Sequence, residues 1–148
     1  MTHRFSIIAS ALLLCAAAAS GSDGPAVSAS HVWIRTAPAG VQVLSGFLTL
    51  ENLTDKPLHI VSVTSPDFAS VAIGSSAVAD QPQKPSEPAT VKLKPHQPVV
   101  LKPDTDHLLL LQPHKRLFDG DMVTLIFNFS DGSSLDLLVP VRSQSPQN

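Results

Sequence analysis

Residues 122–141 read MVTLIFNFSDGSSLDLLVPV, in which two apolar stretches flank the pair Asp131-Gly132. Large apolar side chains occupy every second position on both sides of that pair: Val123, Leu125, Phe127, Phe129, then Leu135, Leu137, Val139 and Val141. A period of two is that of a β-strand with one buried face, and Asp-Gly is typical of tight hairpins. The stretch therefore predicts two long antiparallel strands joined by a short turn.

The chain before this hairpin repeats the same signals on a shorter scale. Apolar strands are predicted over residues 31–35, 41–52, 58–64, 68–73 and 107–111, and a further hairpin over 89–93 and 98–101. In the strand 58–64 we expect Leu58 and Ile60 on one side and Val61 and Val63 on the other. Turn residues separate these strands, and the 13 prolines disfavour helices. The pattern predicts an all-β fold, a sandwich or a barrel.

The first twenty residues read as an export signal. Arg4 precedes an apolar run that ends in an alanine-rich segment, and the run is too short to span a bilayer comfortably. Cleavage is expected between Ala16 and Ser22, giving a soluble periplasmic protein without a membrane span. Cys15 raises the alternative of a lipid anchor, but Leu14 stands where a lipobox generally has a small residue. We expect the order signal peptide (1–20), flexible tether (21–30), one β-domain (31–142) and polar tail (143–148).

Loss of this leader removes Arg4 and Cys15, the only cysteine of the chain. Nine basic side chains then face twelve acidic ones, and the mature protein has neither a disulfide nor a thiolate ligand. No basic patch is evident, so nucleic acid is not an expected partner. No nucleophile elbow surrounds Ser45, and Asp104 and Asp106 are typical solvated turn carboxylates, so we do not expect an enzyme.

Residues 101–113 place a histidine at the start of a buried strand. A Pro-Asp-Thr-Asp turn precedes His107, which shares one face of the strand with Leu109, while Leu108 and Leu110 point to the other face. An imidazole at this position can reach a ligand at the rim of a sheet. A hydrogen-bonded structural histidine is the alternative interpretation, and the strand alone does not choose between them.

Several further stretches resemble one known family when taken in order. Trp33-Ile34-Arg35 is followed by Pro38, and Gly46-Phe47-Leu48-Thr49-Leu50-Glu51-Asn52 comes next. Leu101-Lys102-Pro103 precedes His107, and Leu117 with Gly120-Asp121 precedes the strand 123–129. From about His31 to Val141 the chain is thus similar to the periplasmic copper chaperones of the PCuAC family. The resemblance implies a single cupredoxin-like β-sandwich of Greek-key type.

The resemblance also implies a ligand set, because PCuAC proteins bind Cu(I) through two histidines and two methionines. With the last histidine at His107, the family spacing puts the other three ligands at Gly74, Pro85 and Leu109. None of these three carries a donor that Cu(I) prefers. His107 is therefore the one retained metal-ligand candidate. A Cu(II) or Zn(II) site that combines it with His31, His96 or His114 is an alternative, and Met122 reads as a core or rim residue.

Two functions follow as hypotheses. The first is a copper-handling periplasmic protein linked by family to the copper site of cytochrome oxidase, with weak or no Cu(I) binding in the family manner. The second is a metal-independent interaction module on the same scaffold. For either, the resemblance suggests a cytochrome oxidase subunit or another copper chaperone as the partner.

Overall fold

Nine strands make up the part of the chain that the structure, a computed structural model, describes: residues 25–75 and 91–144. They are β1 (Val27–Arg35), β2 (Val43–Asn52), β3 (Leu58–Thr64), β4 (Phe68–Ser75), β5 (Lys92–Leu93), β6 (Pro98–Leu101), β7 (Asp106–Pro113), β8 (Met122–Phe129) and β9 (Ser134–Arg142). These two ranges contain no helix, and so no helix that could cross a membrane. The all-β prediction is confirmed.

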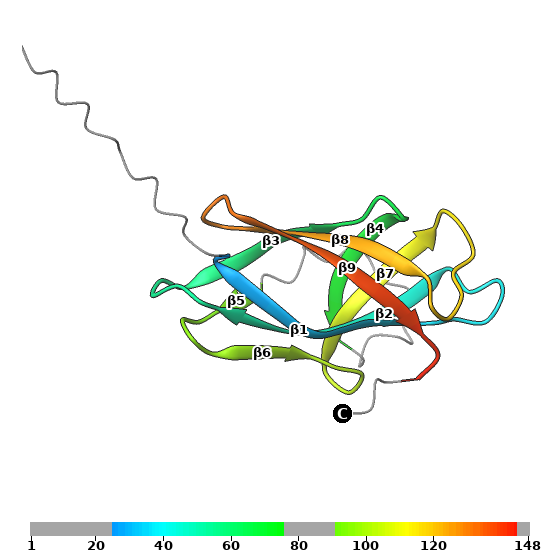
Figure 1. Cartoon of the computed structure of the whole chain (residues 1–148), viewed down its shortest axis with the longest axis horizontal. Helices are drawn as coiled ribbons and strands as arrows, with labels where there is room; N and C mark the ends of the chain where they lie inside the picture. Colours follow the sequence, from blue (N-terminus) through cyan, green and yellow to red (C-terminus); the bar gives the residue numbers. More distant parts are fainter. Residues whose placement is uncertain (1–24, 76–90, 145–148) are drawn as a thin grey trace, which may run out of the picture.

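The strands follow one path, β4-β7-β2-β1-β9-β8-β3-β5, which curls into two layers (Figure 1). One layer holds β4, β7, β2 and β1, and β6 pairs with the second half of β2. The other holds β9, β8, β3 and β5. A short parallel contact joins them, in which Ile34 and Arg35 of β1 face Val141 and Arg142 of β9.

The core lies between these layers and follows the period of two in the sequence. In β8 the side chains of Val123, Leu125 and Phe127 have no exposed surface, and they pack with Leu108 and Leu110 of β7 in one cluster. The hairpin predicted around Asp131-Gly132 is present as β8 and β9. Gly132 adopts a φ of +84°, which a glycine reaches without strain.

Three sequence predictions about the strands are wrong: where the first one begins, how β5 and β6 pair, and which side chains of β3 are buried. Strand β1 begins at Val27, inside the segment expected to be a tether, because Val27 is buried and pairs with Asn52 of β2. Strands β5 and β6 do not form a hairpin with each other, since β5 pairs with β3 and β6 with β2. Val63 is buried together with Leu58 and Ile60, because a bulge after Ile60 shifts the alternation of β3 by one residue.

Structural roles explain why position 46 is a glycine and position 52 an asparagine. Gly46 faces Leu108 across the β2–β7 pairing, and a Cβ added there would lie 3.1 Å from both Leu108 Cβ and Leu110 Cδ1. Asn52 is fully buried at the end of β2. Its amide nitrogen donates to the carbonyls of Lys56 (2.7 Å) and Leu93 (3.1 Å), and its oxygen accepts from Thr54. A fully bonded buried amide thus holds the β2–β3 turn to β5.

Candidate functional site

His107 lies near the start of β7, on the outer face of the first layer. Its backbone neighbour across the β4–β7 ladder is Gly74, and Ala72 faces Leu109 in the same way. The expected alternation of β7 is confirmed, since Leu108 and Leu110 are fully buried in the core while Leu109 is half-buried on the other face. The residue His107 is only 9% exposed.

The imidazole of His107 has a defined orientation. Its Nδ1 lies 3.2 Å from the carbonyl oxygen of Thr105, a separation at which a protonated Nδ1 donates a hydrogen bond. In a neutral ring held this way the lone pair is on Nε2, the arrangement common in metal-binding histidines. The contact is equally compatible with a structural histidine, so the geometry of the ring alone does not identify a ligand.

An aromatic cluster lies beside this histidine on the outer face. Phe47 of β2 has its ring centroid 5.9 Å from that of His107 and 4.8 Å from that of Trp33 on β1. The guanidinium carbon of Arg35 stands 5.7 Å from the Trp33 centroid and 5.6 Å from that of Phe47. Both residues are buried, with 5% exposure for Trp33 and 4% for Phe47, although their side chains belong to the outer face. A cation lying over two rings stabilises the cluster through cation–π attraction.

This cluster was not predicted from sequence. Trp33 and Phe47 stand fourteen positions apart in the sequence and become direct cross-strand partners through the register of β1 with β2. The family-like segments that contain them are the only sequence signal that could have pointed to it.

Two of the three positions at which the resemblance predicted ligands, Gly74 and Leu109, lie next to His107. A Cβ built on Gly74 would lie 2.8 Å from Leu109 Cδ1 and 3.6 Å from Leu109 Cγ. The backbone of Gly74 has no positive φ, so it does not require glycine for conformational reasons. Positions 74, 107 and 109 therefore form one contiguous surface in which the only nitrogen donor is the His107 ring. Pro85 lies outside the described residues.

The other histidines lie at separate places on the fold. His31 is exposed in a bulge of β1, His96 pairs with Asp55 at 2.9 Å, and His114 Nδ1 lies 3.0 Å from the carbonyl oxygen of Pro66. His59 is on β3, in the other layer. Among the described residues no group of three or more His, Cys, Asp and Glu side chains could hold a metal ion. The structure thus gives no support to a Cu(II) or Zn(II) site around His107.

Met122, the methionine expected to fill the core or the rim, is at the rim. It opens β8, pairs with Pro140 of β9 and is 44% exposed. Both strands belong to the layer that does not contain His107. Its thioether is therefore not part of the surface around positions 74, 107 and 109.

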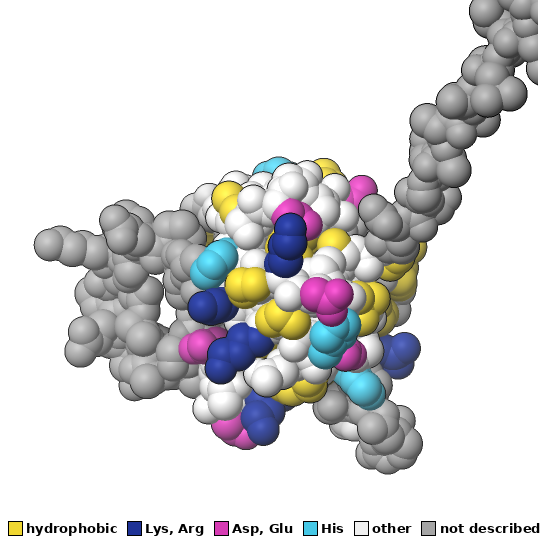
Figure 2. All heavy atoms as spheres, turned by 90° about the vertical axis from the view of Figure 1, so that its left-hand side faces the viewer, with side chains coloured by type: hydrophobic (Ala, Val, Ile, Leu, Met, Phe, Trp, Pro, Cys, Tyr) yellow, Lys and Arg dark blue, Asp and Glu magenta, His cyan; other side chains and the backbone are white. Residues whose placement is uncertain are grey.

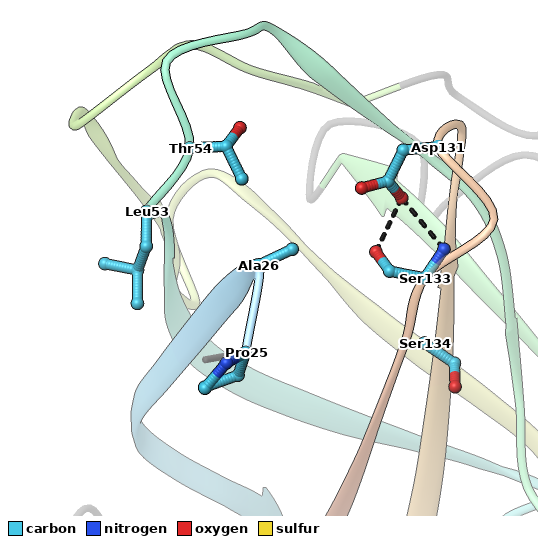
Figure 3. A pocket seen from close by; sticks show the side chains of 7 residues that line it. All are labelled: Pro25, Ala26, Leu53, Thr54, Asp131, Ser133 and Ser134. Atoms are coloured by element: carbon cyan, nitrogen blue, oxygen red, sulfur yellow. Dashed lines mark hydrogen bonds between the residues drawn. The ribbon is translucent and has the colours of Figure 1, made fainter. Parts of the chain in front are cut away.

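A cavity of about 740 Å³ opens at the end of the sandwich where β1 begins (Figure 3). Pro25 and Ala26 line it together with the β2–β3 turn and residues of the β8–β9 hairpin. The Asp131 carboxylate accepts hydrogen bonds from the backbone and side chain of Ser133, which lower its pKa. None of the lining residues belongs to β4 or β7, so this cavity is separate from the His107 surface.

The charges around this end are mixed. Figure 2 shows basic, acidic, apolar and histidine side chains interspersed on that face, with no area of a single charge sign. The exposed ion pair between His96 and Asp55 is the only salt bridge found among the described residues. This face therefore does not gather the like charges that attract a highly charged ligand.

Comparison with known proteins relates this geometry to a family. The family model described as "Putative lipoprotein LpqE-like" matches residues 27–141, which is most of the chain. No curated protein matches the sequence.

Solved structures with the same fold include PCuAC domains. The apo PCuAC domain from PmoF1 is 22% identical, with a TM-score of 0.69 over 82% of this chain and 98% of that one. The copper-bound PCuAC domain from PmoF2 is 20% identical, with a TM-score of 0.67 over 80% and 94%. The Cu(I) form of DR1885 from Deinococcus radiodurans is 20% identical, with a TM-score of 0.60 over 85% and 83%. The expected PCuAC-like, cupredoxin-like fold is confirmed.

Proposed function

Because the chain belongs to the LpqE-like family, we propose that it is an exported, non-catalytic domain of the copper-chaperone type that does not hold Cu(I) tightly. Two of the similar structures are described with copper bound, which supports a connection with copper. The observation that carries the proposal is the surface around His107. Gly74 pairs with His107 across the ladder and Leu109 lies against Gly74, but neither residue supplies a side-chain donor for copper.

The chemistry of Cu(I) explains why this surface should bind the ion weakly. Cu(I) is soft and is bound by thiolate, thioether and imidazole groups. Leu109 fills the volume of a methionine without a sulfur lone pair, and Gly74 has no side chain. One imidazole, buried against Phe47, is a single donor where the family arrangement uses four.

A competition titration tests this proposal. The exported chain is titrated with Cu(I) in the presence of a strong chromophoric Cu(I) chelator, and we expect the chelator to keep the metal. His107→Ala serves as a control and should not alter the curve. A one-to-one complex that survives the chelator would contradict the proposal, and its sensitivity to His31→Ala, His96→Ala or His114→Ala would then identify replacement ligands.

The second candidate is an interaction module that works without metal. It is favoured by the cluster of Trp33, Phe47 and Arg35, which is fully assembled beside a ligand set that lacks its soft donors. The family resemblance suggests the copper-bearing subunit of cytochrome oxidase, or another copper chaperone, as the partner. Binding of the chain to that subunit domain by calorimetry, with and without Cu(I), separates the two: equal affinity in both conditions favours the module.

Export is part of the same proposal. The apolar run before Ala16 supports cleavage between Ala16 and Ser22 and release of a soluble protein into the periplasm. The description of the family as lipoproteins supports the alternative, in which Cys15 becomes a lipidated first residue. Intact-mass measurement decides between them, because a diacylated chain that starts at Cys15 is heavier than a chain that starts within residues 17–23 by the mass of the lipid plus the extra residues. A diacylated product would overturn the soluble form.

A further inference from the structure

Strand β4 forms one edge of the path of strands, and its edge is unusually open. Within the described ranges it pairs with β7 alone, over the whole length from Phe68 to Ser75. Ala69, Ser70 and Ala72 are exposed. The strand FASVAIGS contains no charged residue and no proline, and its ladder with β7 runs without a bulge.

The other strands with an open side carry the features that protect such edges in soluble proteins. β5 has only two residues, one of them Lys92, and β6 begins with Pro98. β1 and β3 are interrupted by bulges, and β9 contains Asp136 and Pro140. In the described part of the chain β4 is therefore the one long, regular and uncharged edge.

An open edge presents a row of backbone N–H and C=O groups that another strand can pair with. We propose that β4 pairs with β4 of a second copy of this chain, antiparallel and about a two-fold axis, so that the first layers of both copies form one continuous sheet. An edge needs another edge as its partner, and a two-fold interface uses the same surface on both copies. The strand that is open on one copy is also the open strand on the other.

The side chains of β4 are compatible with this self-pairing. Antiparallel pairing of FASVAIGS with itself brings together only apolar, small or hydroxyl side chains, and no like charges face each other. The exposed residues Ala69, Ser70 and Ala72 are small, so they permit close approach of the second backbone. A single edge-to-edge ladder of this length is at the small end of protein interfaces, so we expect a weak dimer that depends on concentration.

Sedimentation equilibrium of the exported chain over a concentration series, without copper, tests the proposal. We expect a reversible monomer–dimer equilibrium. Ser70→Lys and Ala72→Lys each place two like charges across the two-fold axis, and each should raise the dissociation constant by about tenfold or more. Circular dichroism confirms that both variants are folded.

Leu138→Lys is the matched control, because Leu138 is 66% exposed on β9 while its backbone pairs with Thr124 of β8. This variant should dimerise as the unmodified chain does. The proposal is overturned by a chain that stays monomeric at all concentrations, or by a dimer that tolerates both β4 lysines. A dimer lost only with Leu138→Lys would place the interface on β9 and would equally overturn it. None of these outcomes bears on copper binding, so the proposed function is tested separately.

Discussion

The contact between positions 74 and 109 gives the sharpest test of the proposed assignment of family ligand positions to this surface. Gly74→His introduces a Cβ that would lie 2.8 Å from Leu109 Cδ1, closer than such atoms approach in proteins. The leucine must therefore move, and we expect the single variant to lose about 1–3 kcal/mol of unfolding free energy through overpacking. Leu109→Met alone nearly conserves volume and should cost less than about 1.5 kcal/mol.

The double variant should lose less unfolding free energy than the sum of the losses in the two single variants. Methionine is unbranched and flexible, so it can turn away from the new imidazole where the leucine branch cannot. We expect a favourable coupling of about 1 kcal/mol between the two substitutions, as is usual for residues in contact. Urea unfolding of the unmodified chain, both single variants and the double variant measures this coupling. Strict additivity would mean that the two side chains do not meet.

The same double variant should gain Cu(I) binding. It supplies one imidazole and one thioether next to His107, and these are donors that Cu(I) prefers. We expect the double variant to take Cu(I) from a chromophoric chelator that keeps the metal from the unmodified chain. Adding His107→Ala should abolish this binding, and adding Pro85→Met should tighten it. If the triple variant with Pro85→Met folds normally and binds no better than the unmodified chain, the assignment of the family positions to this surface is wrong.

Three further predictions concern the fold. Asn52→Ala should lower the unfolding free energy by about 2–4 kcal/mol in urea titrations, because it removes the amide that donates to Lys56 and Leu93 and accepts from Thr54. An effect below about 1 kcal/mol would refute this role. Gly46→Ala should cost about 1–3 kcal/mol, since its methyl group meets Leu108 Cβ at 3.1 Å, and a stabilised variant would show that the ladder can widen. The pKa of Asp131 is lowered in the folded state, so its ionised carboxylate stabilises the fold above the ordinary pKa of 3.8. The unfolding free energy of the unmodified chain should therefore exceed that of Asp131→Ala at pH 7, and this difference should disappear in strong acid. A difference independent of pH would contradict this.

Several features were predictable because they depend on neighbours in the chain. The alternation in β7, β8 and the end of β9 follows from the pleat of a strand, so the buried positions could be read residue by residue. The turn at Asp131-Gly132 follows from the ease with which glycine adopts a positive φ. The spacing along the chain also predicted ligand positions at Gly74 and Leu109. These two positions are neighbours beside His107, and their assignment as ligand positions stays a prediction.

Other features depended on contacts between distant segments. The bulge in β3 moves Val63 into the core, although the local pattern pointed it outward, because burial against the other layer outweighs the regular period. Nothing in residues 27–30 marks a strand, and they become one because the end of β2 offers them a ladder. Local residues likewise could not reveal that β5 and β6 join different strands.

The sequence by itself determined the all-β class and the buried faces of the long strands. It also determined that Gly74, Pro85 and Leu109, where the resemblance predicts ligands, carry no soft donor. These are properties of residue type and period. Only the tertiary structure decided which surfaces those residues share. Strand register places Trp33, Phe47 and Arg35 in one cluster beside His107, and strand order leaves β4 at an open edge. Register and order come from the summed burial of residues far apart in the chain, which no local pattern contains.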